Sequence, residues 1–324
     1  MHTRIKPRRL LLACALALAV APATASAHSV GAELRVVGSD GRTLADLTQY
    51  TSPARVRTDP NADCFGPGTG GSGKQVKVPT PTALGLVADA LPNDHKLRPL
   101  SITDHFSFGL GVCGIGKHEV ASGDAFWYLK RNHVGSQVAG DHLKVHQGDQ
   151  ILWYLAPGFP PGSELSLKVP ARTTPGSSVT ATVYAYADDG TRTPAAGATV
   201  SFASAPTDAS GRTTLNLPNP GLYAVRATRS GDIPSKNASI CVHARVATCP
   251  PAQGRTIYGS PGDDEIATTS GDDVVFAGRG DDRIKLDRGG ADVVDCGPGR
   301  DVVIARRGDR DDRIERSCEK VIRK

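Results

Sequence analysis

The sequence has few aromatic residues and no long amphipathic helical pattern. Phe, Trp and Tyr make up 5% of the 324 residues, whereas 36 glycines and 23 prolines supply many potential turns. Such a composition favours several small β-rich modules over one large core. After residue 27, no apolar run approaches the roughly 18 residues that a membrane-spanning helix needs. We therefore expect a mainly β, modular protein without a transmembrane segment.

A surplus of positive charge is also lacking once the N-terminal segment is set aside. Four Lys or Arg residues among the first nine precede an apolar run over residues 10–20 and the small residues Ala25-Ser26-Ala27. This pattern predicts a secretory signal peptide over residues 1–27. Its basic residues account for most of the formal net charge of +5, and the near-neutral remainder argues against nucleic acid as a partner. We expect a secreted, extracellular protein whose partner is an unknown extracellular ligand or cell-surface component.

Motifs of the common exported hydrolases are missing as well. The sequence contains no G-x-S-x-G, H-E-x-x-H or C-G-S-C motif. His142 and His146 are four residues apart, but Leu143-Lys144-Val145 between them is predicted as a strand, in which the two rings would lie about 13 Å apart. We therefore expect no catalytic residues and no enzymatic activity. The alternative is an exported hydrolase whose catalytic residues are scattered through the N-terminal domain.

The most regular feature of the sequence is a repeat near the C-terminus, in which a glycine turn is followed by aspartate and a short apolar stretch. Six aspartates recur at steps of 9 to 11 residues: Asp264, Asp273, Asp282, Asp292, Asp301 and Asp312. A period near nine predicts a parallel β-roll over residues 255–324. The apolar residue two places after each aspartate should face its core: Ile266, Val275, Ile284, Val294, Val303 and Ile314.

The repeat has the chemistry of a site for a hard cation. Glycine turns can turn backbone carbonyls inward and the aspartates add carboxylates, which together form the oxygen shell that Ca²⁺ requires. Residues 259–295 hold ten acidic and four basic side chains, so the turns should repel one another without an ion. The copies resemble the haemolysin-type (RTX) calcium-binding repeat G-G-x-G-x-D-x-U-x. The resemblance implies that Ca²⁺ is the cofactor, held between turns by turn carbonyls and the six aspartates.

The match to this repeat is incomplete, which leaves a second interpretation open. Ser260-Pro261 and Thr269-Ser270 replace the leading glycine pair, and Arg310 stands where the last copy needs glycine. The alternative is therefore a degenerate β-roll that has lost its metal. Because the copies lose regularity toward the C-terminus, we expect the first three turns to bind the ion best.

Residues 28–158 are predicted to form a small α+β domain. Residues 34–37 and 43–47 are predicted to form a hairpin. One helix is predicted to begin at a cap formed by Thr80 or Thr82 and to end at Pro92. This helix, Phe126-Trp127-Tyr128 and Ile151-Leu152-Trp153 resemble a β-grasp-like extracellular family of uncharacterised function. The same family supplies the C-terminal β-domain of the cobalamin carrier transcobalamin. The aromatic run is predicted to be core, with a ligand groove as the alternative.

Residues 163–246 show the alternation expected of an antiparallel β-sandwich. Apolar residues recur at every second position over residues 179–186 and 198–202, and Asp208-Ala209-Ser210-Gly211 has turn chemistry. Residues 194–200, 207–211 and 221–223 resemble the immunoglobulin-like or prealbumin-like spacers of bacterial surface proteins. The resemblance implies a module that spaces or displays other domains, and we expect the whole protein to bind or adhere at a cell surface or outside the cell.

Seven cysteines indicate a disulfide framework. Cys14 falls within the predicted signal peptide, and six remain: Cys64, Cys113, Cys241, Cys249, Cys296 and Cys318. Six cysteines in an exported chain predict three disulfides. Sequence alone permits 15 pairings, of which the module order favours Cys64 with Cys113, Cys241 with Cys249, and Cys296 with Cys318. The alternative for the middle pair is a metal site that includes His243.

Overall fold

The computed structural model describes residues 29–120, 125–245, 249, 253–287, 289–309 and 311–324. The signal peptide predicted over residues 1–27 lies outside this range. The described residues are mainly β, with one α-helix and one short 3₁₀ helix, which confirms the predicted fold class. No helix in the described part of the chain is both long and apolar enough to cross a membrane.

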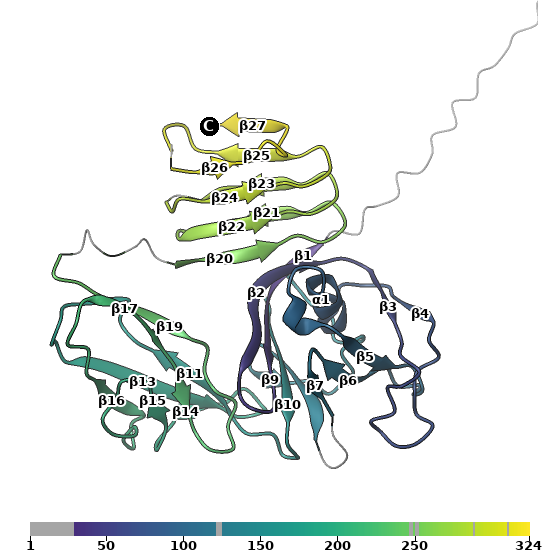
Figure 1. The fold of residues 1–324 in the computed structure, drawn as a ribbon, viewed down its shortest axis with the longest axis horizontal. Coiled ribbons are helices and arrows are strands. Elements are labelled where there is room, and N and C mark those ends of the chain that lie inside the picture. Colours follow the sequence, from purple (N-terminus) through teal and green to yellow (C-terminus); the bar gives the residue numbers. More distant parts are fainter. Residues whose placement is uncertain (1–28, 121–124, 246–248, 250–252, 288, 310) are drawn as a thin grey trace, which may run out of the picture.

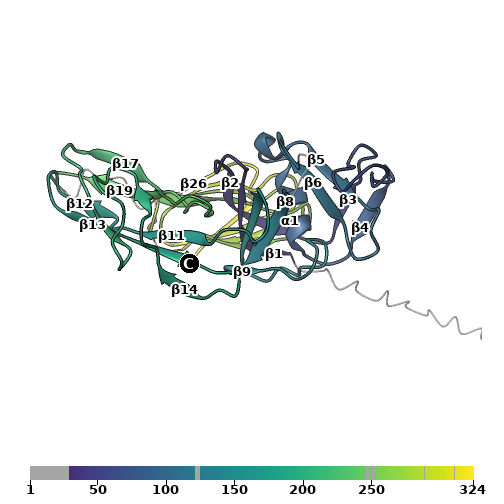
Figure 2. The ribbon, with the colours of Figure 1, turned by 90° about the horizontal axis from the view of Figure 1, so that it is seen from below.

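Figure 1 shows three lobes, with the C-terminal roll stacked above the other two. Viewed from below, in Figure 2, the first lobe and the second lobe lie side by side. Each lobe has its own cluster of buried apolar residues.

The first lobe is a mixed sheet covered by a helix. Its elements are β1 (Val30–Val37), β2 (Thr43–Thr51), β3 (Ala54–Arg57), β4 (Gln75–Val78), α1 (Ala83–Ala90), η1 (His95–Leu97), β5 (Leu100–Thr103), β6 (Gly111–Ile115), β7 (His118–Glu119), β8 (Phe126–Arg131), β9 (Val134–Gly135) and β10 (Gln150–Ala156). Strand β1 pairs antiparallel with β2 and parallel with β10. Trp127 is buried in the core, so the aromatic run serves packing, as predicted.

Helix α1 explains why one predicted strand does not form. The hydroxyl of Thr82 accepts the backbone N–H of Gly85 (3.1 Å), but other N–H groups of the first turn need partners too. The carbonyls of Gly140 and Leu143 accept two of them, from Leu84 and Ala83. Residues 143–145 therefore wrap over the start of the helix instead of forming a strand, and that prediction is wrong.

The second lobe packs short, mostly antiparallel strands around one core. Its strands are β11 (Glu164–Lys168), β12 (Arg172–Thr173), β13 (Val179–Tyr186), β14 (Arg192–Pro194), β15 (Thr199–Val200), β16 (Arg212–Leu215), β17 (Gly221–Val225), β18 (Ala227–Thr228) and β19 (Ala238–Val242). Strand β15 is shorter than the stretch predicted over residues 198–202, because Phe202 has a positive φ of 64° and turns the chain.

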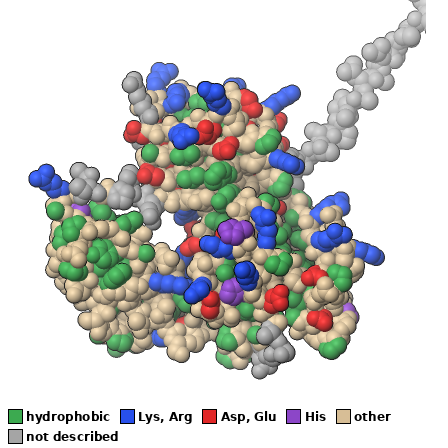
Figure 3. All heavy atoms as spheres, viewed as in Figure 1, with side chains coloured by type: hydrophobic (Ala, Val, Ile, Leu, Met, Phe, Trp, Pro, Cys, Tyr) green, Lys and Arg blue, Asp and Glu red, His purple; other side chains and the backbone are tan. Residues whose placement is uncertain are grey.

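The third lobe is a parallel β-roll, as predicted. One face is the sheet of β20 (Gln253–Tyr258), β22 (Asp272–Phe276), β24 (Val293–Asp295) and β26 (Arg313–Ile314); the other is that of β21 (Glu265–Ala267), β23 (Arg283–Lys285), β25 (Val302–Ala305) and β27 (Lys320–Arg323). Five of the six residues predicted to face the core are at most 2% exposed, and Ile314 is partly buried. Exposed basic residues gather over the C-terminal end (Figure 3), among them Arg313, Lys320 and Arg323.

The roll and the first lobe share one sheet. Strand β20 pairs in parallel with β2, with Thr48 opposite Ile257 and Gln49 opposite Tyr258. A nine-stranded sheet thus runs from β26 through β20 and β2 to β9. The first strand of the roll, β20, therefore extends a sheet that the first lobe already forms.

The structure contains three disulfides within the lobes. Cys64 bonds to Cys113, Cys241 to Cys249 and Cys296 to Cys318, the pairs that the module order favours. Because the sulfurs of Cys241 and Cys249 are joined, they cannot act as thiolate ligands of the alternative metal site.

Candidate metal centre

The six candidate aspartates lie on two edges of the roll. Successive turns alternate between the edges, so the turns that stack are two copies, or 18 to 20 residues, apart. Asp264, Asp282 and Asp301 stack along one edge. The other edge holds Asp273, Asp292 and Asp312. Five of the six are at most 2% exposed, and Asp312 is partly buried.

A ladder of hydrogen bonds joins the aspartates of each edge. The backbone N–H of Asp264 donates to Oδ1 of Asp282 (2.9 Å), and that of Asp282 donates to Oδ1 of Asp301 (2.8 Å). The N–H of Asp301 in turn donates to Oε2 of Glu319 (2.8 Å). Glu319 was not among the predicted site residues, although its position 18 residues after Asp301 matches the stacking repeat. In the aspartates after Asp264, the ladder uses one carboxylate oxygen of each side chain and leaves the other for a second partner.

In the first two turns a hydroxyl provides that second partner. Ser260 donates its backbone N–H and its hydroxyl to the carboxylate of Asp264 (2.7 and 3.0 Å). Thr269 donates its N–H and hydroxyl to Asp273 in the same way. These two residues occupy the position at which the repeat pattern has glycine. The carboxylates of Asp264 and Asp273 are therefore satisfied by protein groups alone.

The later turns leave carboxylate oxygens without a partner. Before Asp282 and Asp301, Gly278 and Gly297 take the place of Ser260, so these two residues offer no hydroxyl. The hydroxyl of Thr268 lowers the pKa of Asp292, although burial outweighs its effect. Oδ2 of Asp282, Asp292 and Asp301 is buried and accepts no hydrogen bond from the described residues. A buried oxygen in this state costs about 1 to 3 kcal/mol, more when it is charged. The geometry thus favours the third, fourth and fifth turns for the ion. Of the first three turns expected from regularity, only the third has a carboxylate oxygen of this kind.

The burial of these oxygens raises the pKa of the aspartates that carry them. Burial raises the pKa of Asp282 to about 8, and the charges of Asp264 and Asp301 add to the effect. Burial likewise raises the pKa of Asp292 to about 6, together with the charges of Asp273 and Asp312. A divalent cation beside these oxygens would favour their ionised form.

Backbone oxygens lie close to the same space. A Cβ at Gly297 would lie 2.0 Å from the carbonyl oxygen of Gly278, and one at Gly299 would lie 1.8 Å from that of Gly280. The turns at residues 277–282 and 296–301 therefore stack with carbonyls directly against glycine. No three His, Cys, Asp or Glu side chains converge among the described residues, so carbonyls must complete any ion shell. Carboxylates of Asp282 and Asp301 with these carbonyls form a donor set that fits Ca²⁺.

In the presence of a chelator, we expect the stability of the roll to fall as the pH rises from 4 to 8. Folded Asp282 keeps its proton up to about pH 8, whereas the unfolded chain releases it near the ordinary value of 3.8. The folded state therefore binds more protons across this window, and one proton changes the free energy of unfolding by at most about 1.4 kcal/mol per pH unit. Urea denaturation at several pH values measures the slope. Asp282→Asn is the control and should flatten it; an equal slope in both proteins would contradict the assignment.

Comparison with known proteins finds a family match for the first part of the roll. Residues 258–290 match the family model of the RTX calcium-binding nonapeptide repeat, in four copies. RTX nonapeptide repeats bind calcium. No curated protein and no solved structure matches the chain. Three of the aspartates, Asp292, Asp301 and Asp312, lie beyond the matched residues but continue the same two stacks. Arg288 and Arg310 lie outside the described residues.

Proposed function

We propose that the RTX repeats make this chain a secreted, non-catalytic binding protein whose roll becomes rigid on binding calcium. The observation that carries the proposal is a set of buried carboxylate oxygens, in Asp282, Asp292 and Asp301, that accept no hydrogen bond from the described residues. In the absence of an ion, each of these groups must either hold a proton or place its charge beside other carboxylates, and both oppose folding. Bound calcium makes the contribution of these groups to folding favourable, because the free energy of calcium binding adds to the free energy of folding.

The proposed ions lie in the outer part of the roll. The inner turns have Ser260 and Thr269 as internal partners, and β20 is held by β2 of the first lobe. The inner rungs therefore form a base that needs no metal, and the outer rungs fold on it when calcium is present. Millimolar extracellular calcium suits such a site, since extracellular calcium modules bind with Kd on the order of 10⁻⁴ to 10⁻³ M.

The disulfides support an extracellular location. Three bonds join all six cysteines after residue 27, and such bonds persist in oxidising compartments. RTX repeats together with disulfides are typical of extracellular proteins. We propose that the first two lobes contact an extracellular or cell-surface ligand while the roll holds them in place.

His142 and His146 are poor candidates for catalytic residues of the alternative, an exported hydrolase. His142 and His146 have side chains that are 56% and 70% exposed. Each pairs with a carboxylate close to it in sequence, Asp141 at 3.3 Å and Asp149 at 3.4 Å. Ring nitrogens paired in this way at an open surface are typical of solubilising residues. Catalytic histidines are usually held in a cleft.

We expect 10 mM Ca²⁺ to stabilise the roll of the intact chain. For one site with Kd near 1 mM, mass action adds about 1.4 kcal/mol to the free energy of unfolding. Thermal melting followed by circular dichroism, with calcium or with a chelator, measures the shift. Mg²⁺ at the same concentration is the matched control and should give a smaller shift, because it demands stricter octahedral geometry. Equal melting curves in calcium and in chelator would refute the proposal.

A further inference from the structure

The three lobes meet around a polar cleft of about 630 Å³. Strands β1, β2 and β10 of the first lobe form one side, β11 and residues 236–238 of the second lobe form another, and residues 254–256 of the roll form the third. A cleft between modules with a volume of 300 to 1,000 Å³ is a common place for a small-molecule site.

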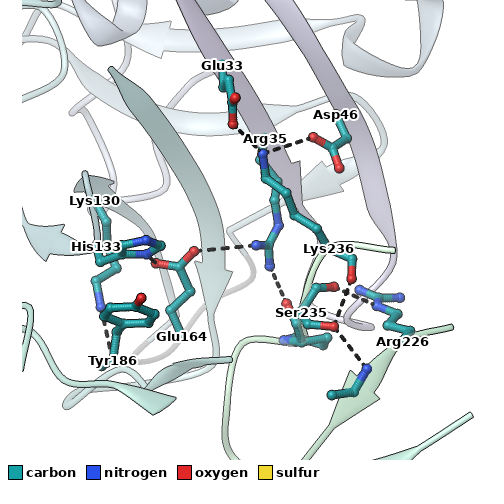
Figure 4. Close-up of polar contacts among 12 residues, drawn as sticks. Glu33, Arg35, Asp46, Lys130, His133, Glu164, Tyr186, Arg226, Ser235 and Lys236 are labelled. Atoms are coloured by element: carbon teal, nitrogen blue, oxygen red, sulfur yellow. Dashed lines mark hydrogen bonds and ion pairs between the residues drawn. The ribbon is translucent and has the colours of Figure 1, made fainter. Parts of the chain in front are cut away.

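Charged residues from all three lobes converge on Glu33. Lys236 of the second lobe places its Nζ 2.7 Å from Oε2 of Glu33 and 3.5 Å from Oδ1 of Asp46, as Figure 4 shows. Arg255 of the roll places its guanidinium 2.8 Å from Oε1 of Glu33. This side of the cleft therefore has two cations that are about half exposed or less, held in place by carboxylates.

A second group of contacts forms the inner part of the cleft. Arg35, only 3% exposed, lies 3.4 Å from Glu164 and donates to the backbone carbonyl of Pro234. Glu164 also lies 2.9 Å from Nδ1 of His133, whose ring stacks on that of Tyr186 (Figure 4). Since each partner is held by at least two contacts, the wall is rigid before any ligand arrives.

Two buried donors in this wall have no partner. Nε of Arg35 and the hydroxyl of Thr48 are inaccessible to solvent and make no hydrogen bond to the described residues. Both residues line the cleft. Buried donors without partners are rare and costly, at about 1 to 3 kcal/mol each. Because neither atom is exposed in the empty cleft, both belong to the interior of the wall, and a molecule in the cleft would bind the exposed polar groups in front of them.

The lining also indicates the chemistry of that molecule. Three cations (Arg35, Lys236 and Arg255) balance three carboxylates (Glu33, Asp46 and Glu164), counting His133 as neutral. The balance gives no preference for a strongly charged ligand. The lining residues include no Phe, Trp or Tyr, which disfavours an aromatic ligand. Donors and acceptors lie side by side, an arrangement that hydroxyl groups match because each both donates and accepts.

We infer that this cleft binds a neutral, polyhydroxylated molecule of one or two sugar rings. The inference names the ligand class of the binding protein proposed above and rests on that proposal. It does not depend on bound calcium, because the wall from the roll is β20, which pairs with β2 in the inner base. Binding should therefore persist in a chelator, so a failure of the calcium proposal and a failure of this one are separable.

Saturation-transfer NMR of the full chain from residue 28 tests the inference. The probes are maltose, cellobiose and diacetylchitobiose, each at 10 mM, with glucuronic acid and glucosamine as charged comparisons. We expect saturation transfer to at least one neutral disaccharide, with and without chelator, and a weaker signal from the charged sugars. No transfer to any neutral disaccharide, or stronger binding of a charged sugar, would overturn the inference.

Variants distinguish the cleft from the rest of the surface. Thr256→Val removes a partly exposed hydroxyl of the lining without changing the size of the side chain and should raise the Kd about fivefold, the effect of one hydrogen bond. Asn237→Leu, at an exposed position of the lining, should weaken binding without threatening the fold. Thr180→Val on the exposed side of β13 is the matched control and should leave the Kd unchanged. Wild-type affinity in both cleft variants would place the sugar elsewhere and refute the assignment.

Discussion

Asp282→Asn should abolish most of the calcium-dependent stabilisation of the roll, whereas Asp273→Asn should leave it in place. Both aspartates are fully buried in regular copies of the repeat. They differ in their partners: Asp273 accepts hydrogen bonds from Thr269 and from the backbone of Arg255, whereas Oδ2 of Asp282 accepts none from the residues that the structure describes. We therefore expect Asp282 to face the ion, and the asparagine variant should lose most of the calcium-linked stabilisation of about 1.4 kcal/mol expected at 10 mM Ca²⁺.

When calcium is removed, the two substitutions should also change the stability of the roll in opposite directions. Asp282→Asn removes a buried carboxylate that is repelled by Asp264 and Asp301, so the chelated protein should be as stable as the wild type or more stable. Asp273→Asn loses hydrogen bonds to charged oxygen in both conditions and should be less stable in both. Melting curves of the three proteins in 10 mM calcium and in chelator decide the matter. Loss of the calcium shift in Asp273→Asn alone would place the ion on the other edge.

The sequence predicts the roll well because its signal is local. Each turn and the apolar residue that follows it lie within nine residues, so the period and the inward positions such as Val275 and Val303 can be read directly. The location of the unpartnered oxygens is not local. It depends on which turns stack, 18 to 20 residues apart, and on the hydroxyls of Ser260 and Thr269. The repeat pattern treats Ser260 and Thr269 only as missing glycines. It cannot show that their hydroxyls bind the carboxylate oxygens that would otherwise be free to bind an ion.

Contacts between the lobes have no local signal at all. The pairing of β2 with β20 joins residues about 200 positions apart. From sequence alone, each strand could equally well be an edge strand of its own sheet. The cleft lining around Glu33 arises only from this arrangement, with Lys236 and Arg255 coming from different lobes. The likenesses of the first two lobes to β-grasp-like and prealbumin-like domains stay predictions, since no solved structure matches the chain.

Removing the disulfide of the roll with Cys296→Ala and Cys318→Ala should destabilise it by about 3 kcal/mol, judged from a closed loop of 22 residues. It should also weaken calcium binding. Cys318 precedes Glu319, whose carboxylate accepts the backbone N–H of Asp301, and Cys296 precedes the glycine turn that stacks on residues 277–282. Without the bond, both sides of the proposed outer site lose their anchor, because the last strands end the sheets and have no further rung to hold them.

The double variant Cys241→Ala and Cys249→Ala is the matched control. It removes a disulfide from the end of the second lobe, and should lower the stability of that lobe while leaving the calcium midpoint of the roll unchanged. Circular dichroism during a calcium titration gives the midpoint for each protein. We expect the midpoint of the Cys296 and Cys318 variant to rise several-fold. An unchanged midpoint would mean that the ion lies closer to the first lobe, between turns that β2 and the hydroxyl partners already hold in place.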